Sequence, residues 1–252
     1  MTEDSLHLVQ ITDCHLLAEP DGRLSDVDTQ ATLAAVVERV RAEAPDMVLA
    51  TGDLSQDGTP ASYRRFKALA GRLGAPVHCL PGNHDHPATL AAVLPGDGLH
   101  VGRQLIAGGW QIVFLDSTIA GEDDGELAES ELAALEAVLG DDPARHALVC
   151  LHHHPVVVGG AWHDFVSLAN PDALFAVIER HPRVRGLLWG HIHQPFDAER
   201  GAVRLMATPS TCFQFKRTPG GELGIADDPP GYRYVRLHAD GGIETEVRWL
   251  DG

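Results

Sequence analysis

Five short apolar runs in this chain each end on polar residues that can bind a metal. They lead into Asp13-Cys14-His15, Gly52-Asp53, Gly82-Asn83-His84-Asp85, His152-His153-His154 and Gly190-His191-Ile192-His193. Short apolar runs bounded by turn residues predict buried strands. The carboxyl ends of parallel strands lie along one edge of an α/β sheet. We therefore expect an α/β protein whose polar side chains meet at one edge.

Seven of these residues offer nitrogen or oxygen ligands, which are too many for one tetrahedral zinc ion and suit two metals that share a ligand. The seven are Asp13, His15, Asp53, Asn83, His152, His191 and His193. Asp13 and His15 lie two residues apart, so in an extended segment their side chains face the same side. Gly52 allows a sharp turn, which lets the Asp53 carboxylate sit between two ions. The mixed ligands suit Fe, Mn, Zn or Co better than Ca or Mg.

The histidine triplet leaves a choice of ligand. His152 directly follows its strand and is preferred. Strand alternation points His153 to the opposite side and leaves His154 as a weaker rival on the side of His152. Alternation also turns Cys14 away from its two neighbours. The four cysteines form no CxxC pair, so we expect reduced thiols packed as small apolar groups.

The first three quarters of the chain alternate strand, loop and helix. Helices are expected over about 28–44, 60–72, 87–94, 128–139 and 171–180. Further strands are expected over about 99–101, 104–107, 111–115, 203–207, 211–215, 232–238 and 243–249, with a long surface loop at 218–231. Since no linker divides the chain, we expect one domain over 1–252. Residues 1–195 would form the α/β core that carries the site, and 196–252 would add β-strands to its sheets.

Charge and composition narrow the classes of function. With 44% apolar and 22% charged residues, the chain is typical of soluble globular proteins. No apolar stretch reaches the roughly 20 residues that span a bilayer, and the acidic start is unlike a signal peptide. We therefore expect a cytoplasmic protein without a membrane partner. The net charge of −17 argues against nucleic-acid binding. Two bound cations would still admit a small anionic substrate.

The order of these motifs resembles the calcineurin-like metallophosphoesterases, whose signature is Asp-x-His, Gly-Asp, Gly-Asn-His-Asp/Glu, His and Gly-His-x-His. This chain carries every part of it within residues 11–193. Within the family it looks most like the class III cyclic nucleotide phosphodiesterases of the bacterial 3′,5′-cyclic AMP type. That closer likeness depends on further stretches, among them 50–57, 151–155, 190–194, 207–216 and 237–241. The resemblance implies a four-layer α-β-β-α sandwich of two mixed sheets flanked by helices, the metallophosphoesterase fold.

The resemblance also implies residue roles. One metal would be held by Asp13, His15 and His193, and the other by Asn83, His152 and His191. Asp53 would bridge the two ions. The substrate phosphate would lie against His15, Asp53, Asn83, His84 and His193.

A mechanism follows from these roles. Two metals would lower the pKa of a shared water from ~15.7 towards ~7, and the resulting hydroxide would attack phosphorus in line. The leaving 3′ oxygen needs a proton, for which His84 is the general-acid candidate, with phosphate binding as its alternative role. Asp85 would orient His84 or a ligand. Trp162, Phe213 and Phe215 are candidates for stacking on the base.

The expected activity is hydrolysis of 3′,5′-cyclic AMP, or a related cyclic nucleotide, to the 5′-monophosphate. A broader phosphodiesterase acting on 2′,3′-cyclic nucleotides or glycerophosphodiesters is the alternative. A non-catalytic scaffold of the same fold is a minor one, because no ligand is missing. A homo-oligomer is left open.

Overall fold

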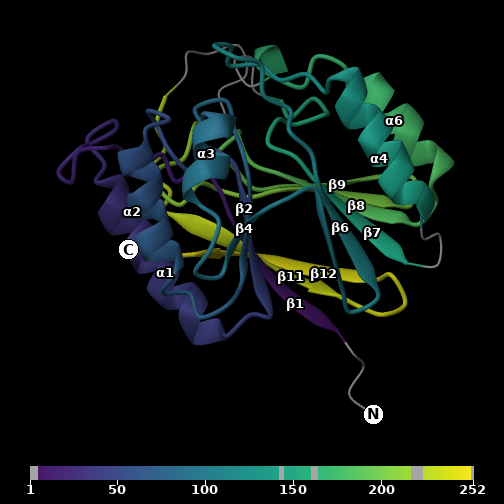
Figure 1. Cartoon of the computed structure of the whole chain (residues 1–252), viewed down its shortest axis with the longest axis horizontal. Coiled ribbons are helices and arrows are strands. Elements are labelled where there is room, and N and C mark those ends of the chain that lie inside the picture. Colours follow the sequence, from purple (N-terminus) through teal and green to yellow (C-terminus); the bar gives the residue numbers. More distant parts are fainter. Residues whose placement is uncertain (1–4, 142–144, 160–163, 217–223, 251–252) are drawn as a thin grey trace.

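Two mixed β-sheets of six strands each lie face to face in the computed structural model, with helices on both outer sides (Figure 1). The structure describes residues 5–141, 145–159, 164–216 and 224–250. The expected four-layer α-β-β-α sandwich is therefore confirmed.

The first sheet has the strand order β12-β11-β1-β2-β3-β4. Its strands are β1 (Leu6–Ile11), β2 (Met47–Thr51), β3 (Val77–Leu80), β4 (Leu99–Val101), β11 (Gly231–Leu237) and β12 (Ile243–Trp249). Strands β1 to β4 are parallel, whereas β11 and β12 pair antiparallel at one side.

The second sheet has the order β5-β6-β7-β8-β10-β9. Its strands are β5 (Gln104–Ala107), β6 (Trp110–Phe114), β7 (His146–Cys150), β8 (Val184–Trp189), β9 (Phe196–Arg200) and β10 (Val203–Ala207). The four central strands are parallel, and β5 and β9 pair antiparallel at the two edges. The last quarter of the chain thus adds strands to both sheets.

The helices form the two outer layers. Helices α1 (Thr29–Glu43), α2 (Pro60–Ala70) and α3 (Pro87–Val93) cover the first sheet, and α4 (Glu129–Asp141) and α6 (Pro171–Arg180) cover the second (Figure 1). Asp28 caps α1 by accepting a hydrogen bond from Ala31 N. No helix among the described residues is long and apolar enough to cross a membrane.

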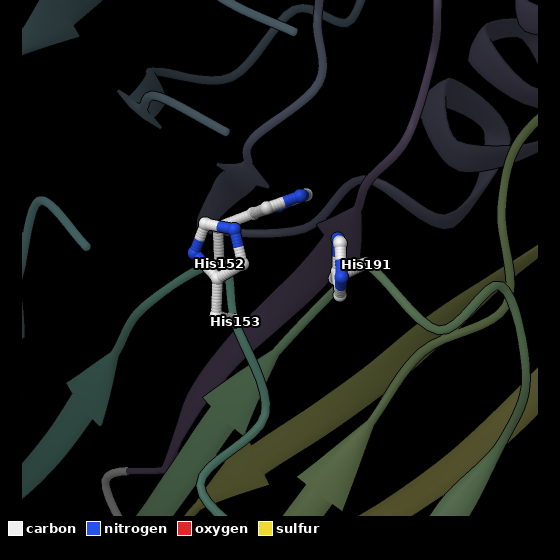
Figure 2. A group of neighbouring side chains, drawn as sticks. All are labelled: His152, His153 and His191. Carbon is white, nitrogen blue, oxygen red and sulfur yellow. The ribbon is translucent and has the colours of Figure 1, made fainter. Parts of the chain in front are cut away.

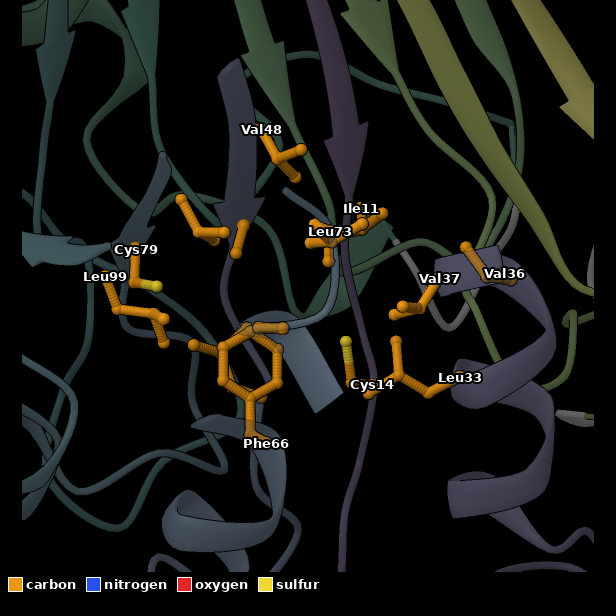
Figure 3. Packing of buried hydrophobic residues seen from close by; sticks show 14 of the residues in the cluster. Ile11, Cys14, Leu33, Val36, Val37, Val48, Phe66, Leu73, Cys79 and Leu99 are labelled. Atoms are coloured by element: carbon orange, nitrogen blue, oxygen red, sulfur yellow. The ribbon is translucent and has the colours of Figure 1, made fainter. Parts of the chain in front are cut away.

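Three apolar cores hold the four layers together. Strand alternation divides β1 between two of them: Val9 and Ile11 face the helices, and Leu8 faces the other sheet. Each fully buried side chain of this kind contributes about 1.5–3 kcal/mol. Cys14 and Cys79 lie in the core between the first sheet and its helices (Figure 3). All four cysteines are buried free thiols, as expected.

One predicted strand is absent from the structure, and one observed strand was not predicted. Residues 211–215 form turns and a single bridge rather than a strand, although their aromatic pattern favoured one. The segment is instead held by buried hydrogen bonds, among them Ser210 Oγ to Asp13 O at 2.8 Å and Cys212 N to Ser210 Oγ at 2.9 Å. Strand β9 was missed because its sequence, Phe-Asp-Ala-Glu-Arg, lacks the apolar alternation of a half-buried strand.

Buried polar side chains join the two sheets beneath the site. The Gln10 amide on β1 donates to Thr51 Oγ1 at 2.7 Å and to Trp189 O at 3.0 Å, and it accepts from Thr208. Because every polar atom of this amide is bonded, its burial carries no large desolvation cost. The end of β8 is thereby fixed against the ends of β1 and β2.

Candidate metal centre

The chain continues in register beyond the ends of β1 and β2. Asp13 N donates to Gly52 O at 3.0 Å, and His15 N donates to Asp53 O at 2.8 Å. Two segments separated by almost forty residues in the sequence therefore run side by side, as expected for the carboxyl ends of parallel strands.

The segments that follow β7 and β8 of the second sheet lie against those that follow β1 and β2 of the first sheet. Gly190 N, after β8, donates to His152 O, after β7, at 3.2 Å. A Cβ atom at Gly190 would lie 2.1 Å from Thr12 Oγ1 of the first sheet. A Cβ atom at Gly52, whose φ is 97°, would lie 2.3 Å from His152 Nδ1. Only glycine lets the strand ends approach this closely.

Five of the proposed ligands have a left-handed backbone, with φ between 46° and 67°. They are Asp13, His15, Asp53, His191 and His193, out of nine such non-glycine residues in the described part of the chain. This conformation costs of order 1–3 kcal/mol at a non-glycine residue and persists where surrounding contacts enforce it. Because this backbone conformation recurs at five of the seven proposed ligands, the fold holds their side chains in directions that an extended strand would not give.

The first ligand group joins residues from both sheets. His15 Nε2 lies 3.0 Å from His193 Nε2, and His193 Nε2 lies 3.4 Å from Asp13 Oδ1. The ligand atoms of these three side chains all lie within 4.8 Å of one another. Asp53 Oδ2 lies 3.6 Å from His15 Nε2, at the side of this group.

The second group lies on the other side of Asp53. His152 Nε2 is 3.1 Å from Asn83 Oδ1 and 3.4 Å from Asp53 Oδ2. The ring of His191 lies 5.1 Å from that of His152. All seven proposed ligands thus lie together, and the Asp53 carboxylate lies between the two groups.

Backbone carbonyl groups orient three of the histidine rings. His152 Nδ1 donates to Thr51 O at 2.9 Å, and His193 Nδ1 donates to Phe213 O at 2.8 Å. His191 Nε2 donates to Val166 O at 3.0 Å. A hydrogen bond of this kind fixes the tautomer and leaves the opposite nitrogen as the metal ligand. The donor set therefore fits two metal ions.

The charges of the site also fit metal binding. Burial lowers the pKa of His15 to about 4 and holds the pKa of His191 well below its usual value, so both rings are neutral at pH 7. Burial raises the pKa of Asp53, but His152 more than offsets this and holds it well below its usual value. Burial lowers the pKa of His152, but Asp53 raises it to about 9. A histidine that binds a metal must free one ring nitrogen, so a cation would replace the proton on His152 Nε2.

His153 lies closer to the site than strand alternation predicts. Its ligand nitrogen lies within 4.8 Å of those of His152 and His191, and Figure 2 shows the three side chains together. The chain leaves the extended conformation after Leu151, so alternation no longer applies there. His153 Nδ1 lies 2.8 Å from Ser117 Oγ, which gives this ring a partner outside the two ligand groups.

Asp85 ties together the two segments that carry Asp53 and Asn83. Its carboxylate accepts from Leu54 N at 3.1 Å, Ser55 N at 3.0 Å and Gly82 N at 2.9 Å, and also from the Tyr63 hydroxyl. Burial and the charge of Asp53 raise the pKa of this carboxyl to about 7. Asp85 therefore acts on the backbone beside the proposed ligands.

His84 lies at the edge of the site. Its backbone N donates to Asp53 Oδ1 at 2.9 Å, and its ring centroid is 5.1 Å from that of His15. Gln56 contacts both rings and was missed in the sequence, where it stands in a turn without any periodic signal. A cavity of about 230 Å³ covers the site and is lined by His15, Leu24, Asp53, Gln56, Asn83, His84, Asp123, His191, His193, Phe213 and Phe215.

Comparisons with known proteins agree with this geometry. The sequence profile of the calcineurin-like phosphoesterases matches residues 6–195. The chain is 45% identical to the 3′,5′-cyclic adenosine monophosphate phosphodiesterase CpdA of Pseudomonas aeruginosa, covering 99% of this chain and 92% of the relative. It is 41% identical to CpdA of Escherichia coli K12, covering 98% and 91%. A dimetal phosphatase from Danio rerio has the same fold, with a TM-score of 0.66 at 16% identity over 98% of this chain and 99% of that one.

We predict that Asp85→Asn weakens metal binding. The amide would direct an NH₂ group at backbone N–H donors and loosen the segments that they belong to. Loss of a residue that supports metal ligands typically lowers metal affinity about 10–100-fold. Isothermal titration with Mn²⁺ measures the change, and Asp97→Asn, at a side chain that is 85% exposed, is the matched control. Unchanged Mn²⁺ affinity in Asp85→Asn would contradict this role.

Proposed function

The chain belongs to the calcineurin-like phosphoesterase family. From its similarity to full-length 3′,5′-cyclic AMP phosphodiesterases we infer that it hydrolyses 3′,5′-cyclic AMP to the 5′-monophosphate. The family is metal-dependent, and the chain is a phosphoric diester hydrolase. The observation that carries the proposal is the Asp53 carboxylate, which lies 3.6 Å from His15 Nε2 and 3.4 Å from His152 Nε2. A carboxylate that lies between two ligand groups suits a pair of cations. The identity of the substrate is inferred from the full-length relatives.

We assign one ion to Asp13, His15 and His193 and the other to Asn83, His152 and His191, with Asp53 shared. When bound, the two ions activate water and neutralise the phosphate oxygens. The imidazole, carboxylate and amide donors favour Fe, Mn, Zn or Co.

The substrate phosphate is proposed to lie over His15, Asp53, Asn83, His84 and His193. These side chains line one cavity, and the hydrogen bond from its own backbone N to Asp53 holds His84 at the rim. From there its ring donates to the leaving 3′ oxygen. That oxygen belongs to a ribose alcohol and leaves poorly without such help.

The base is proposed to stack on Phe215 or Phe213. The Phe215 ring lies 4.4 Å from that of His193 at an interplanar angle of 27°, and both phenylalanines line the cavity over the site. A second cavity of about 430 Å³ also borders Phe215 and adds Lys216 and Trp249 to its lining. Aromatic faces of this kind bind bases without strong sequence preference. Trp162, the third candidate, lies outside the described residues.

The alternatives have less support. A scaffold without activity would not need to keep seven ligands and their orienting carbonyl groups. A preference for 2′,3′-cyclic nucleotides or glycerophosphodiesters is not favoured by relatives that are named for 3′,5′-cyclic AMP. The net charge of −17 agrees with a small-molecule substrate, and we propose a cytoplasmic enzyme without a nucleic-acid partner.

We predict that His84→Ala retains two metal ions and loses about 10²–10⁴-fold in turnover of 3′,5′-cyclic AMP. It should lose much less on bis(p-nitrophenyl) phosphate, because an aryl oxide leaves without a hydrogen-bond donor. Steady-state rates on both substrates, with metal content measured on the same samples, make the comparison. Equal losses on the two substrates would contradict the role at the leaving oxygen.

The proposed substrate is tested by the kcat/KM values for 3′,5′-cyclic AMP, 2′,3′-cyclic AMP and glycerophosphodiesters at defined metal content. We expect 3′,5′-cyclic AMP to have the highest value. If it has the lowest, the substrate assignment is wrong and the family membership stands.

A further inference from the structure

We propose that Gln56 is a positioning residue that sets the proton positions on two histidines at once. It would place the proton of His15 on Nδ1 and the proton of His84 on Nε2. The proposal deepens the proposed function, since it gives a physical reason why one ring binds a metal and the other serves the leaving oxygen.

The Gln56 amide lies between the two rings. Its Oε1 is 2.8 Å from His15 Nδ1, and its Nε2 is 3.1 Å from His84 Nδ1. Gln56, His15 and His84 all line the cavity over the site. One amide thus contacts a proposed metal ligand and the residue proposed to serve the leaving group.

The backbone holds this amide in place. Gln56 N donates to Leu16 O at 2.9 Å, which continues the pairing that follows β1 and β2. The next residue, Asp57, accepts from Ala18 N at 2.8 Å and from Thr59 N at 3.1 Å. Gln56 therefore stands in an ordered turn at a fixed distance from both rings.

The position of His15 decides which way the amide faces. His15 Nε2 points at the ligand group, 3.0 Å from His193 Nε2 and 3.6 Å from Asp53 Oδ2. A histidine that binds a metal through Nε2 carries its proton on Nδ1. That proton needs an acceptor, and the amide oxygen of Gln56 is the atom beside it.

The orientation of the Gln56 amide then determines which ring nitrogen of His84 carries the proton. With its oxygen on His15, the amide presents N–H groups to His84 Nδ1, so this nitrogen must accept. The proton of neutral His84 therefore lies on Nε2, the nitrogen opposite Gln56. A carboxylate at position 56 would accept a hydrogen bond from both rings. Only an amide therefore places the proton on different nitrogens of the two histidines.

With its proton on Nε2, His84 assists the reaction as a hydrogen-bond donor to the leaving 3′ oxygen, rather than as the general acid that the sequence suggested. The protons of the reaction balance without a net transfer from the His84 ring. Attack places an O–H group on phosphorus, the bond from phosphorus to the 3′ oxygen breaks, and the O–H proton passes to the 3′ oxygen.

The test is the protonation of the ring nitrogens in the zinc-loaded protein, followed by long-range ¹H–¹⁵N correlation spectra. His84→Ala and His15→Ala identify the signals by their loss. We expect His15 protonated on Nδ1 and His84 protonated on Nε2 alone. In Gln56→Glu, the proton of His84 should move from Nε2 to Nδ1 while the proton of His15 stays on Nδ1. A proton on His84 Nδ1 in the unaltered protein, or no change in Gln56→Glu, would overturn the proposal.

Gln56→Met keeps the length of the side chain and removes both hydrogen bonds. We expect its Zn²⁺ affinity to fall about 10–100-fold, whereas Gln56→Glu keeps an acceptor for His15 and binds Zn²⁺ at least as tightly as the unaltered protein. Gln104→Met, on the exposed edge strand β5, is the matched control and should bind Zn²⁺ normally. Equal affinity in Gln56→Met and the control would overturn the role at His15.

A kinetic comparison tests the role at His84. At saturating metal, Gln56→Met should lose about tenfold more on 3′,5′-cyclic AMP than on bis(p-nitrophenyl) phosphate, because only the former needs a donor at the leaving oxygen. Equal losses would overturn this part of the proposal. If the protein does not hydrolyse cyclic AMP at all, the proposed function fails, and the spectra and Zn²⁺ affinities still decide the role of Gln56.

Discussion

The left-handed backbone at the strand ends is the constraint on which the site depends. Asp13, His15, Asp53, His191 and His193 all have positive φ, which turns their side chains into one space instead of letting them alternate along an extended chain. The local cost is of order 1–3 kcal/mol per residue. Backbone hydrogen bonds between neighbouring strand ends hold these conformations in place. The apolar cores on either side keep the strands from shifting.

The fold and the meeting of the candidate ligands at one place could largely be predicted from the sequence, because both follow from local patterns. Apolar runs of strand length ended on polar residues, and parallel strands bring such ends to one edge. Strand β9 could not be predicted, since a charged edge strand has no apolar alternation. The segment 211–215 was wrongly expected to be a strand, because its burial comes from contacts with Asp13 that the sequence does not reveal. Gln56 has no local signal, because its contacts are with two histidine rings that other segments bring to it.

The negative charge of the site has to be offset before an anionic substrate can bind. Asp13 and Asp53 are buried carboxylates in a protein of net charge −17, an environment that would repel a phosphodiester. Their pKa values are held low by neighbouring histidines against the opposing effect of burial, so both remain charged. Bound cations reverse the local potential and make the same residues suitable for an anion. Bound metal ions would thus also offset the cost of burying the two carboxylates.

The central claim is that the strand ends form one site for two metals joined by Asp53. Anomalous scattering from crystals grown with Mn²⁺ tests this most directly. The account predicts two peaks that both adjoin the Asp53 carboxylate, one beside His15 and His193 and the other beside Asn83 and His152. A single peak, or two peaks that do not share Asp53, would contradict it.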